Sequence, residues 1–291
     1  MSVTTTGIYQ PEPLLEGKFI FLSASKPSRN FDLFPLSPAP STRTSVEIEE
    51  AVVSLARAVF SNRGRLVFGG HPSISPLVAS VAAEYFPARH INEGEEPVWI
   101  YQSKAFEKVI PASTQSLEKL GFARIHWIEQ FGDQEYQASL AGQEQCLESL
   151  RKMREAMIEL RPEADQSDRK PLPPPVAMVA IGGMEGVVRE ASLYLEKTPG
   201  RVYTLGTTAG AAQHLGTYLA KNLLKEERRY ESYVLEKRVT VLEDEFPVRR
   251  MEFRVSEAQE LPLAPYAVLM QQMVWQIAGK RPPAVSTPKA L

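Results

Sequence analysis

The sequence predicts an α/β protein with a Rossmann-like, doubly wound and mostly parallel sheet that carries helices on both faces. Short apolar segments alternate with segments of helical periodicity, which is typical of a parallel sheet with crossover helices. Several apolar segments end in turns of glycine or hydroxyl residues. The chain has 291 residues and is 43% hydrophobic, so it can bury a large core. In such sheets ligands bind beyond the carboxyl ends of the strands, so we expect the site among these turns.

Apolar segments predict the strands, and 3.6-residue periodicity between them predicts the helices. The expected strands are 18–22, 65–68, 97–101, 125–128, 176–181 and 201–205, with two more at 238–242 and 250–255. The expected helices are 46–60, 74–86, 136–160, one that begins after Gly183, 211–224 and 266–277. The last of these is apolar on most sides, so it must be buried against its own sheet or against a partner.

The composition along the chain predicts one domain with variable ends. We expect an N-terminal tail at 1–16 and a single domain over 17–280. Within that domain, the polar, proline-rich segment 161–175 is expected to be a mobile loop, and 225–280 to be a C-terminal elaboration. Residues 281–291 read as a disordered tail.

Charge and cysteine content exclude several classes. Lys and Arg (33) nearly balance Asp and Glu (35), so the field that non-specific nucleic-acid binding requires is absent. No apolar run reaches membrane-span length and no signal peptide is visible, which favours a cytoplasmic protein. Cys146 is the single cysteine, and we expect it to be a small core residue. The four histidines are scattered, so no metal site and no cofactor are expected.

The most informative segment is 176–190, where an apolar strand runs into a glycine turn and then a helix. Gly182, Gly183 and Gly186 allow close backbone approach, and the first-turn amides of the helix favour an anion such as phosphate. The segment is neither a G-x-G-x-x-G fingerprint nor a P-loop. The alternative is a tight structural turn without a ligand.

Four turns are expected to line one crevice, those at Ser23, Gly69, Gly182 and Gly206. Their side chains have two interpretations each. Ser23, Ser25, Thr207 and Thr208 could bind phosphate or ribose, or only cap their turns. His71 could donate to a phosphate or stack on a base, or simply face solvent. Arg154 could bind phosphate bidentately, or form salt bridges along its own helix with residues such as Glu148.

Three ordered motifs resemble the SLOG superfamily, over roughly residues 18–224. They are Met153-Arg154-Glu155-Ala156-Met157, Gly182-Gly183-Met184-Glu185-Gly186 with Glu190, and Gly206-Thr207-Thr208-Ala209-Gly210-Ala211-Ala212. The superfamily includes LONELY GUY phosphoribohydrolases, DprA-like proteins and nucleotide-sensor domains of Thoeris-type antiviral systems. The third motif is similar to a turn of those sensor domains.

The resemblance implies a ligand-binding set with Arg154 on phosphate and Glu190 on ribose. Together with the residues of the four turns, this gives the expected ligand-binding set, which contains Ser23, Ser25, Gly69, Gly70, His71, Arg154, Gly182, Gly183, Met184, Glu185, Gly186, Arg189, Glu190, Gly206, Thr207 and Thr208. LONELY GUY enzymes read about Pro-Gly-Gly-x-Gly-Thr-x-x-Glu, whereas here Arg189 falls where their Glu stands and Glu190 comes one residue later. One residue turns a helical side chain by about 100°, which favours the sensing branch.

We therefore expect a sensor or sequestering protein for ADP-ribose, cyclic ADP-ribose or a related NAD-derived molecule, in antiviral defence and with no turnover required. The first alternative is a LONELY GUY-like phosphoribohydrolase that cleaves the base from nucleoside 5′-monophosphates, with Arg154 and Glu190 as catalytic residues. The second is a DprA-like DNA-handling protein, which the near-neutral charge disfavours. The resemblance also implies a homo-oligomer such as a dimer, and a separate effector protein as partner.

Overall fold

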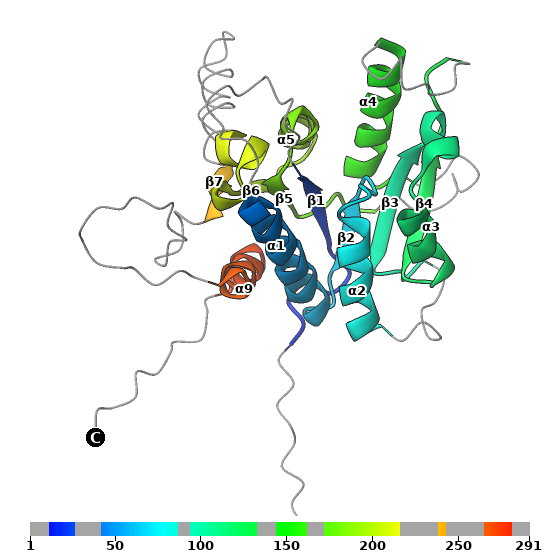
Figure 1. The fold of residues 1–291 in the computed structure, drawn as a ribbon. Helices are drawn as coiled ribbons and strands as arrows, with labels where there is room; N and C mark the ends of the chain where they lie inside the picture. Colours follow the sequence, from blue (N-terminus) through cyan, green and yellow to red (C-terminus); the bar gives the residue numbers. More distant parts are fainter. Residues whose placement is uncertain are drawn as a thin grey trace, which may run out of the picture.

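Parallel strands form one sheet in the computed structural model, which describes residues 12–26, 42–86, 94–132, 144–161, 172–215, 238–242 and 265–280 (Figure 1). The described strands are β1 (Phe19–Ser25), β2 (Arg65–Phe68), β3 (Val98–Ser103), β4 (Ala123–Ile128), β5 (Ala177–Gly182), β6 (Arg201–Leu205) and β7 (Val239–Val241). Their order is β4-β3-β2-β1-β5-β6-β7, and every pair is parallel. The order runs outward in both directions from the β1–β5 pair, as a doubly wound sheet requires, and the predicted fold class is confirmed.

Helices cover both faces of the sheet (Figure 1). One layer contains α1 (Thr42–Ser61), α2 (Ser75–Tyr85), α3 (Ala112–Lys119) and α9 (Tyr266–Ile277), and the other contains α4 (Glu144–Ile158) and α5 (Glu185–Lys197). Because side chains alternate along a strand, β1 sends Ile20 and Leu22 to the first layer and Phe19 and Phe21 to the second. Burial on both faces explains the nearly continuous apolar strands of the sequence.

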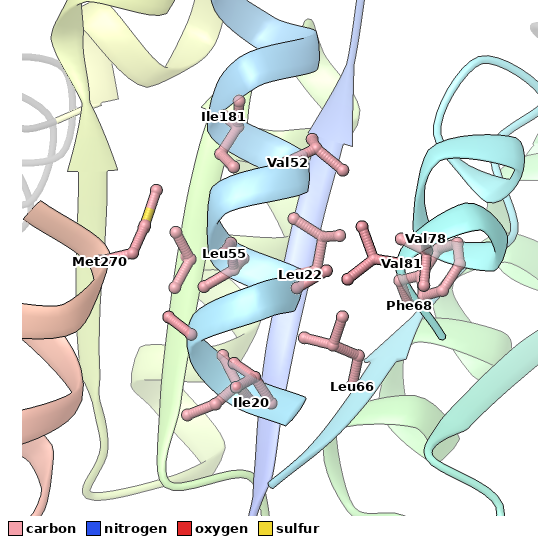
Figure 2. Packing of buried hydrophobic residues seen from close by; sticks show 14 of the residues in the cluster. Ile20, Leu22, Val52, Leu55, Leu66, Phe68, Val78, Val81, Ile181 and Met270 are labelled. Carbon is pink, nitrogen blue, oxygen red and sulfur yellow. The ribbon is translucent and has the colours of Figure 1, made fainter. Parts of the chain in front are cut away.

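The last helix, α9, packs into the protein's own core. Leu269, Met270, Met273 and Val274 of α9 are fully buried, and α9 lies along α1 (Figure 1). Figure 2 shows Met270 beside Leu55 of α1, on the same side of the sheet as Ile20 and Leu22. Most of the apolar surface of this helix is therefore buried within the chain, while Val268 remains 44% exposed.

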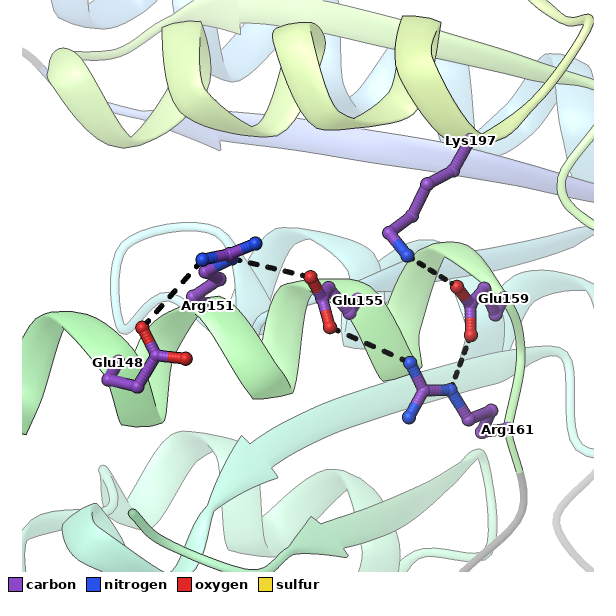
Figure 3. A network of polar contacts seen from close by, with 6 residues as sticks. All are labelled: Glu148, Arg151, Glu155, Glu159, Arg161 and Lys197. Atoms are coloured by element: carbon purple, nitrogen blue, oxygen red, sulfur yellow. Dashed lines mark hydrogen bonds and ion pairs between the residues drawn. The ribbon is translucent and has the colours of Figure 1, made fainter.

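The second layer holds α4 and α5 against the other face. Met153, Ala156 and Met157 of α4 are buried there, and Cys146 is a buried free cysteine, as predicted. The outer side of α4 carries a network of ion pairs that joins Glu148, Arg151, Glu155, Glu159, Arg161 and Lys197 (Figure 3). Lys197 belongs to α5, so this network also ties α4 to the end of α5.

The predicted strands are found within a few residues of their expected bounds. The main difference is that β1 and β3 continue into polar residues, to Ser25 and Ser103, where the predictions end at 22 and 101. The predicted strand 250–255, the helix portions 136–143 and 216–224, most of the 161–175 loop and the 281–291 tail lie outside the described residues. Among the helices that are described, none has the length and apolar character to cross a membrane.

Candidate functional site

A cavity of about 570 Å³ opens at the carboxyl edge of the sheet, beside the point where the strand order reverses. Its walls come from the ends of β1, β2 and β3, the segments that follow β2 and β3, the inner side of α4 and the first two turns of α5. The lining residues are Leu22, Ser23, Ala24, Ser25, Phe68, Gly69, Gly70, His71, Pro72, Gln102, Phe106, Ile110, Pro111, Leu150, Met153, Arg154, Met184, Gly186, Val187 and Glu190. This is the position where doubly wound folds bind ligands, and the volume is typical of a small-molecule site.

Three charged or polar side chains form a chain of contacts at one end of the cavity. Glu190 of α5 accepts a hydrogen bond from Ser23 Oγ at 2.5 Å on Oε2, and pairs through Oε1 with Arg154 Nε at 3.2 Å. The three residues come from β1, α4 and α5, which places them far apart in the sequence. The structure therefore brings together the two residues for which the resemblance implied ligand contacts.

The guanidinium of Arg154 is held at one edge and open at the other. Its Nε is committed to Glu190, and among the described residues neither Nη atom has a hydrogen-bond partner. Nη2 lies beside the first turn of α5, 3.3 Å from where a Cβ on Gly186 would stand. The Val187 N–H donates to the Met184 carbonyl at 3.0 Å, whereas the Gly186 N–H has no partner among the described residues. A guanidinium and a helix-start amide, two kinds of hydrogen-bond donor for an anion, therefore lie close together here.

The helical salt-bridge interpretation of Arg154 is wrong. Arg151, one turn earlier on α4, makes those contacts instead, with Glu148 at 4.0 Å and Glu155 at 3.4 Å (Figure 3). Arg154 instead points toward α5 and pairs with Glu190. It does so because it lies close to the side of α4 that Met153, Ala156 and Met157 bury against the sheet.

The Gly182-Gly183 turn serves the fold rather than an anion. Both residues have positive φ, and a Cβ would meet Ile48 at 2.7 Å for Gly182 and Val187 at 2.2 Å for Gly183. The Gly182 N–H donates to Thr208 Oγ1 at 2.7 Å, and the Gly183 N–H donates to the Ser25 carbonyl at 2.7 Å. Their predicted role as phosphate-holding amides is therefore corrected, since both donors are already used.

The turn after β6 does not reach the cavity. Gly206, Thr207 and Thr208, which form η4 (Gly206–Thr208), are absent from the described lining, in contrast to the prediction. Thr208 Oγ1 donates to the Leu205 carbonyl at 2.6 Å, and Thr207 Oγ1 contacts the Tyr266 hydroxyl at 2.7 Å. The physical reason is the strand order, since β6 lies beyond β5 and not beside β1.

Glu185 and Arg189 also lie outside the lining. They form an exposed i, i+4 ion pair on α5, on the side turned away from the cavity. Met184 and Gly186 line the cavity as expected. Glu190, one residue beyond the enzyme register, nonetheless lines the cavity.

His71 follows β2 and lines the cavity with Gly69 and Gly70. Its Nδ1 accepts from the Ser73 N–H at 3.3 Å and contacts Ser73 Oγ at 2.9 Å. A backbone N–H can only donate, so the neutral ring carries its proton on Nε2. Burial lowers the pKa of His71 below its ordinary value, which favours this neutral form.

Sequence reasoning missed Gln102 and the apolar wall. Gln102 Nε2 donates to the Gly69 carbonyl, and the residue is 9% exposed at the end of β3. Phe106, Ile110 and Pro111 follow it along η1 (Lys104–Val109) and the start of α3. The carboxyl-end rule would have found Gln102 had the predicted strand continued past 101.

Comparison with protein-family models assigns the chain to a family. The model of the SLOG cluster3 family matches residues 40–238, more than half of the sequence. The matched range includes Arg154, Gly186 and Glu190, while Ser23 and Ser25 precede it. No curated protein matches the chain. The matched length, together with the Rossmann-like sheet and the motifs around Arg154 and Glu190, shows that this chain belongs to the SLOG cluster3 family.

Proposed function

We propose that the protein binds a nucleotide-derived small molecule of the ADP-ribose or cyclic ADP-ribose type, as a sensor or sequestering protein in antiviral defence. Family membership suggests a nucleotide-related function. The observation that carries the finer proposal is the open edge of the Arg154 guanidinium beside the first turn of α5, inside a cavity at the strand-order reversal.

A phosphate group fits this edge on chemical grounds. The two Nη groups of an arginine form a planar fork that matches two phosphate oxygens, and the fork here is aimed by the Nε–Glu190 contact. The α5 amides add donors and the positive end of the helix dipole. Phosphate binding would also neutralise the cavity end of Arg154 without breaking its pair with Glu190.

A ribose hydroxyl is the natural donor for Glu190. A carboxylate has about four lone-pair positions, and Ser23 and Arg154 use two of them. A sugar next to a phosphate bound at Arg154 would reach the remaining ones. No turnover is required for this arrangement to bind.

The test is isothermal titration with ADP-ribose, its cyclic isomers, NAD and AMP, on wild type, Arg154→Ala and the matched variant Arg151→Ala. Charge-assisted hydrogen bonds are worth about 1.5–3 kcal/mol each, so Arg154→Ala should weaken binding at least about tenfold. Arg151 lies on the same helix outside the cavity lining, so Arg151→Ala should bind like wild type. Equal loss in both variants, or no binding by any compound, would overturn the proposal.

A second candidate, a phosphoribohydrolase, is favoured by one observation. Glu190 enters the cavity next to Arg154 despite the register shift, so a carboxylate and a phosphate-holding arginine do share one site. Release of free base from AMP, followed by chromatography, tests this function. Turnover that disappears in Glu190→Gln while AMP binding persists would establish the enzyme, and binding without base release would leave the sensor proposal standing.

A further inference from the structure

The cavity wall has further hydrogen-bonding groups at β2 and β3, which lie one and two strands beyond β1 in the sheet. The carboxyl ends of β2 and β3 place His71 and Gln102 there, and Phe106, Ile110 and Pro111 add apolar surface. A flat aromatic ring packs well on such a wall, and one donor and one acceptor at its edge would fix its orientation.

Gln102 contributes the acceptor. Its Nε2 is bound to the Gly69 carbonyl, and since only the amide nitrogen can donate, this contact fixes which way the side chain points. Oε1 has no hydrogen-bond partner among the described residues, and it keeps some solvent-accessible surface. The residue is otherwise about nine-tenths buried and lines the cavity, so the cavity is where Oε1 is accessible.

The orientation of the Gln102 amide requires a glycine at position 70. Gly70 has a φ of 67°, and a Cβ there would stand 2.8 Å from Gln102 Nε2 and 2.8 Å from a methyl group of Ile100. Its carbonyl accepts from the buried Thr114 hydroxyl at 3.0 Å, which fixes the turn to α3. The amide of Gln102 is thus held by the backbone of the β2 turn.

His71 contributes the donor. Because Ser73 occupies Nδ1, the proton lies on Nε2, and no partner for Nε2 exists among the described residues. Nε2 also keeps some solvent-accessible surface, so it is accessible from the cavity that His71 lines.

We infer that Gln102 and His71 select a 6-aminopurine, adenine, as the base of the ligand. The exocyclic N6 amino group would donate to Gln102 Oε1, while a ring nitrogen beside it would accept from His71 Nε2–H. Adenine offers such a donor next to an acceptor on one edge. This inference rests on the proposed function, because it concerns the base of the nucleotide whose phosphate is proposed to bind Arg154.

A 6-oxopurine is disfavoured by the same two groups. Guanine and hypoxanthine present a carbonyl oxygen where adenine has its amino group, so two acceptors would face each other at Gln102 Oε1. Gln102 cannot turn its amide over to compensate, because Nε2 would leave the Gly69 carbonyl without its donor.

Titration of the full chain with AMP and IMP tests the inference, since the two nucleotides differ only in the group on position 6 of the purine and in the proton that the 6-oxo form carries on N1. AMP should bind about 5- to 150-fold more tightly than IMP. Equal affinities would overturn the inference and leave the proposed function intact. Absence of binding by both, and by ADP-ribose, would overturn the two together.

A variant pair identifies the residue. Gln102→Met keeps the volume of the side chain but removes Oε1, so the ratio of AMP to IMP affinity should fall toward one. Gln115→Met makes the same change on α3 outside the cavity lining and should keep the wild-type ratio. If Gln102→Met does not fold, as judged by circular dichroism, the wild-type comparison with IMP still decides. A wild-type ratio in folded Gln102→Met would contradict the assignment.

Discussion

Two arginines one turn apart on α4 have opposite surroundings. The side chain of Arg151 is 64% exposed and pairs with Glu148 and Glu155 of its own helix (Figure 3). The side chain of Arg154 is 12% exposed and pairs across to α5 with Glu190, which is 16% exposed. Both are ion pairs between an arginine and a glutamate, but they differ in solvation and in the elements that they join.

This difference in burial should give the two ion pairs different contributions to stability. Exposed pairs on a helix contribute little, because water screens them and the side chains lose freedom. A largely buried pair is different, because removing one partner leaves the other charge poorly solvated. The comparison therefore predicts unequal responses to the same substitution.

The largest difference should appear in the stability of the two arginine variants. Arg154→Ala should lower the free energy of unfolding by about 1–3 kcal/mol, since Glu190 loses its partner in a poorly solvated position. Arg151→Ala should change it by less than about 1 kcal/mol. Urea denaturation followed by circular dichroism measures both.

A compensating variant sharpens this result. Arg154→Ala with Glu190→Gln removes the charge that Arg154→Ala alone strands, so part of the lost stability should return. Equal destabilisation by Arg154→Ala and Arg151→Ala would mean that the buried pair behaves as a surface pair.

A smaller effect is expected for His71, a half-buried titratable group that also lines the cavity. Burial lowers the pKa of its imidazole in the folded state, whereas the unfolded chain takes up its proton near pH 6.5. Stability present above about pH 6.5 should therefore be lost as the pH falls. Between about pH 7 and pH 5 the melting temperature of wild type should decrease more steeply than that of His71→Gln.

The two proteins should behave alike above about pH 7.5, where the imidazole is neutral in both states. Parallel melting curves over the whole range would show that the environment of His71 does not resist protonation.

The smallest change in stability is expected for Gly186→Ala, which probes the space beside the Arg154 guanidinium. The new Cβ would stand 3.3 Å from Nη2, at the end of a side chain that can shift slightly. Alanine also favours the helix, so stability should change by less than about 1 kcal/mol. Ligand affinity should nevertheless fall, because the methyl group fills the space where a phosphate would meet α5.

Ser192→Ala is the matched change on α5, since Ser192 is exposed and lies outside the cavity lining. Its affinity should equal that of wild type. Unchanged affinity in Gly186→Ala would place the phosphate elsewhere in the cavity.

The fold could be predicted in large part because its signals are local. Apolar segments and helical periodicity identify β1 to β7 and the helices of both layers except α3, which was not predicted. The glycine turn at 182–183 is forced by backbone conformation and crowding. The strand order is not local. Without it, the turn after β6 was expected at the cavity, although Thr207 and Thr208 serve internal contacts.

The site was predictable only where a motif fixed the residue. Arg154 and Glu190 came from the resemblance, whereas periodicity alone would have favoured a surface role for Arg154. Gln102 carries no motif, and it reaches the cavity because β3 extends two residues past its apolar portion. The direction of a side chain on a helix, as for Arg189 and Glu190, depends on how the preceding turn sets the helix.

In the described part of the chain, two ion pairs join α5 to α4 and the residue that follows it. Lys197 and Glu159 join α5 to the chain that follows α4 at 2.7 Å, while Glu190 and Arg154 meet about two helical turns away. A phosphate that bridges the Nη groups of Arg154 and the first turn of α5 would add a contact between α4 and the N-terminal end of α5. Ligand binding would then slow amide hydrogen exchange in α4 and α5. The local stability of this helix pair would thus depend on whether the cavity is occupied.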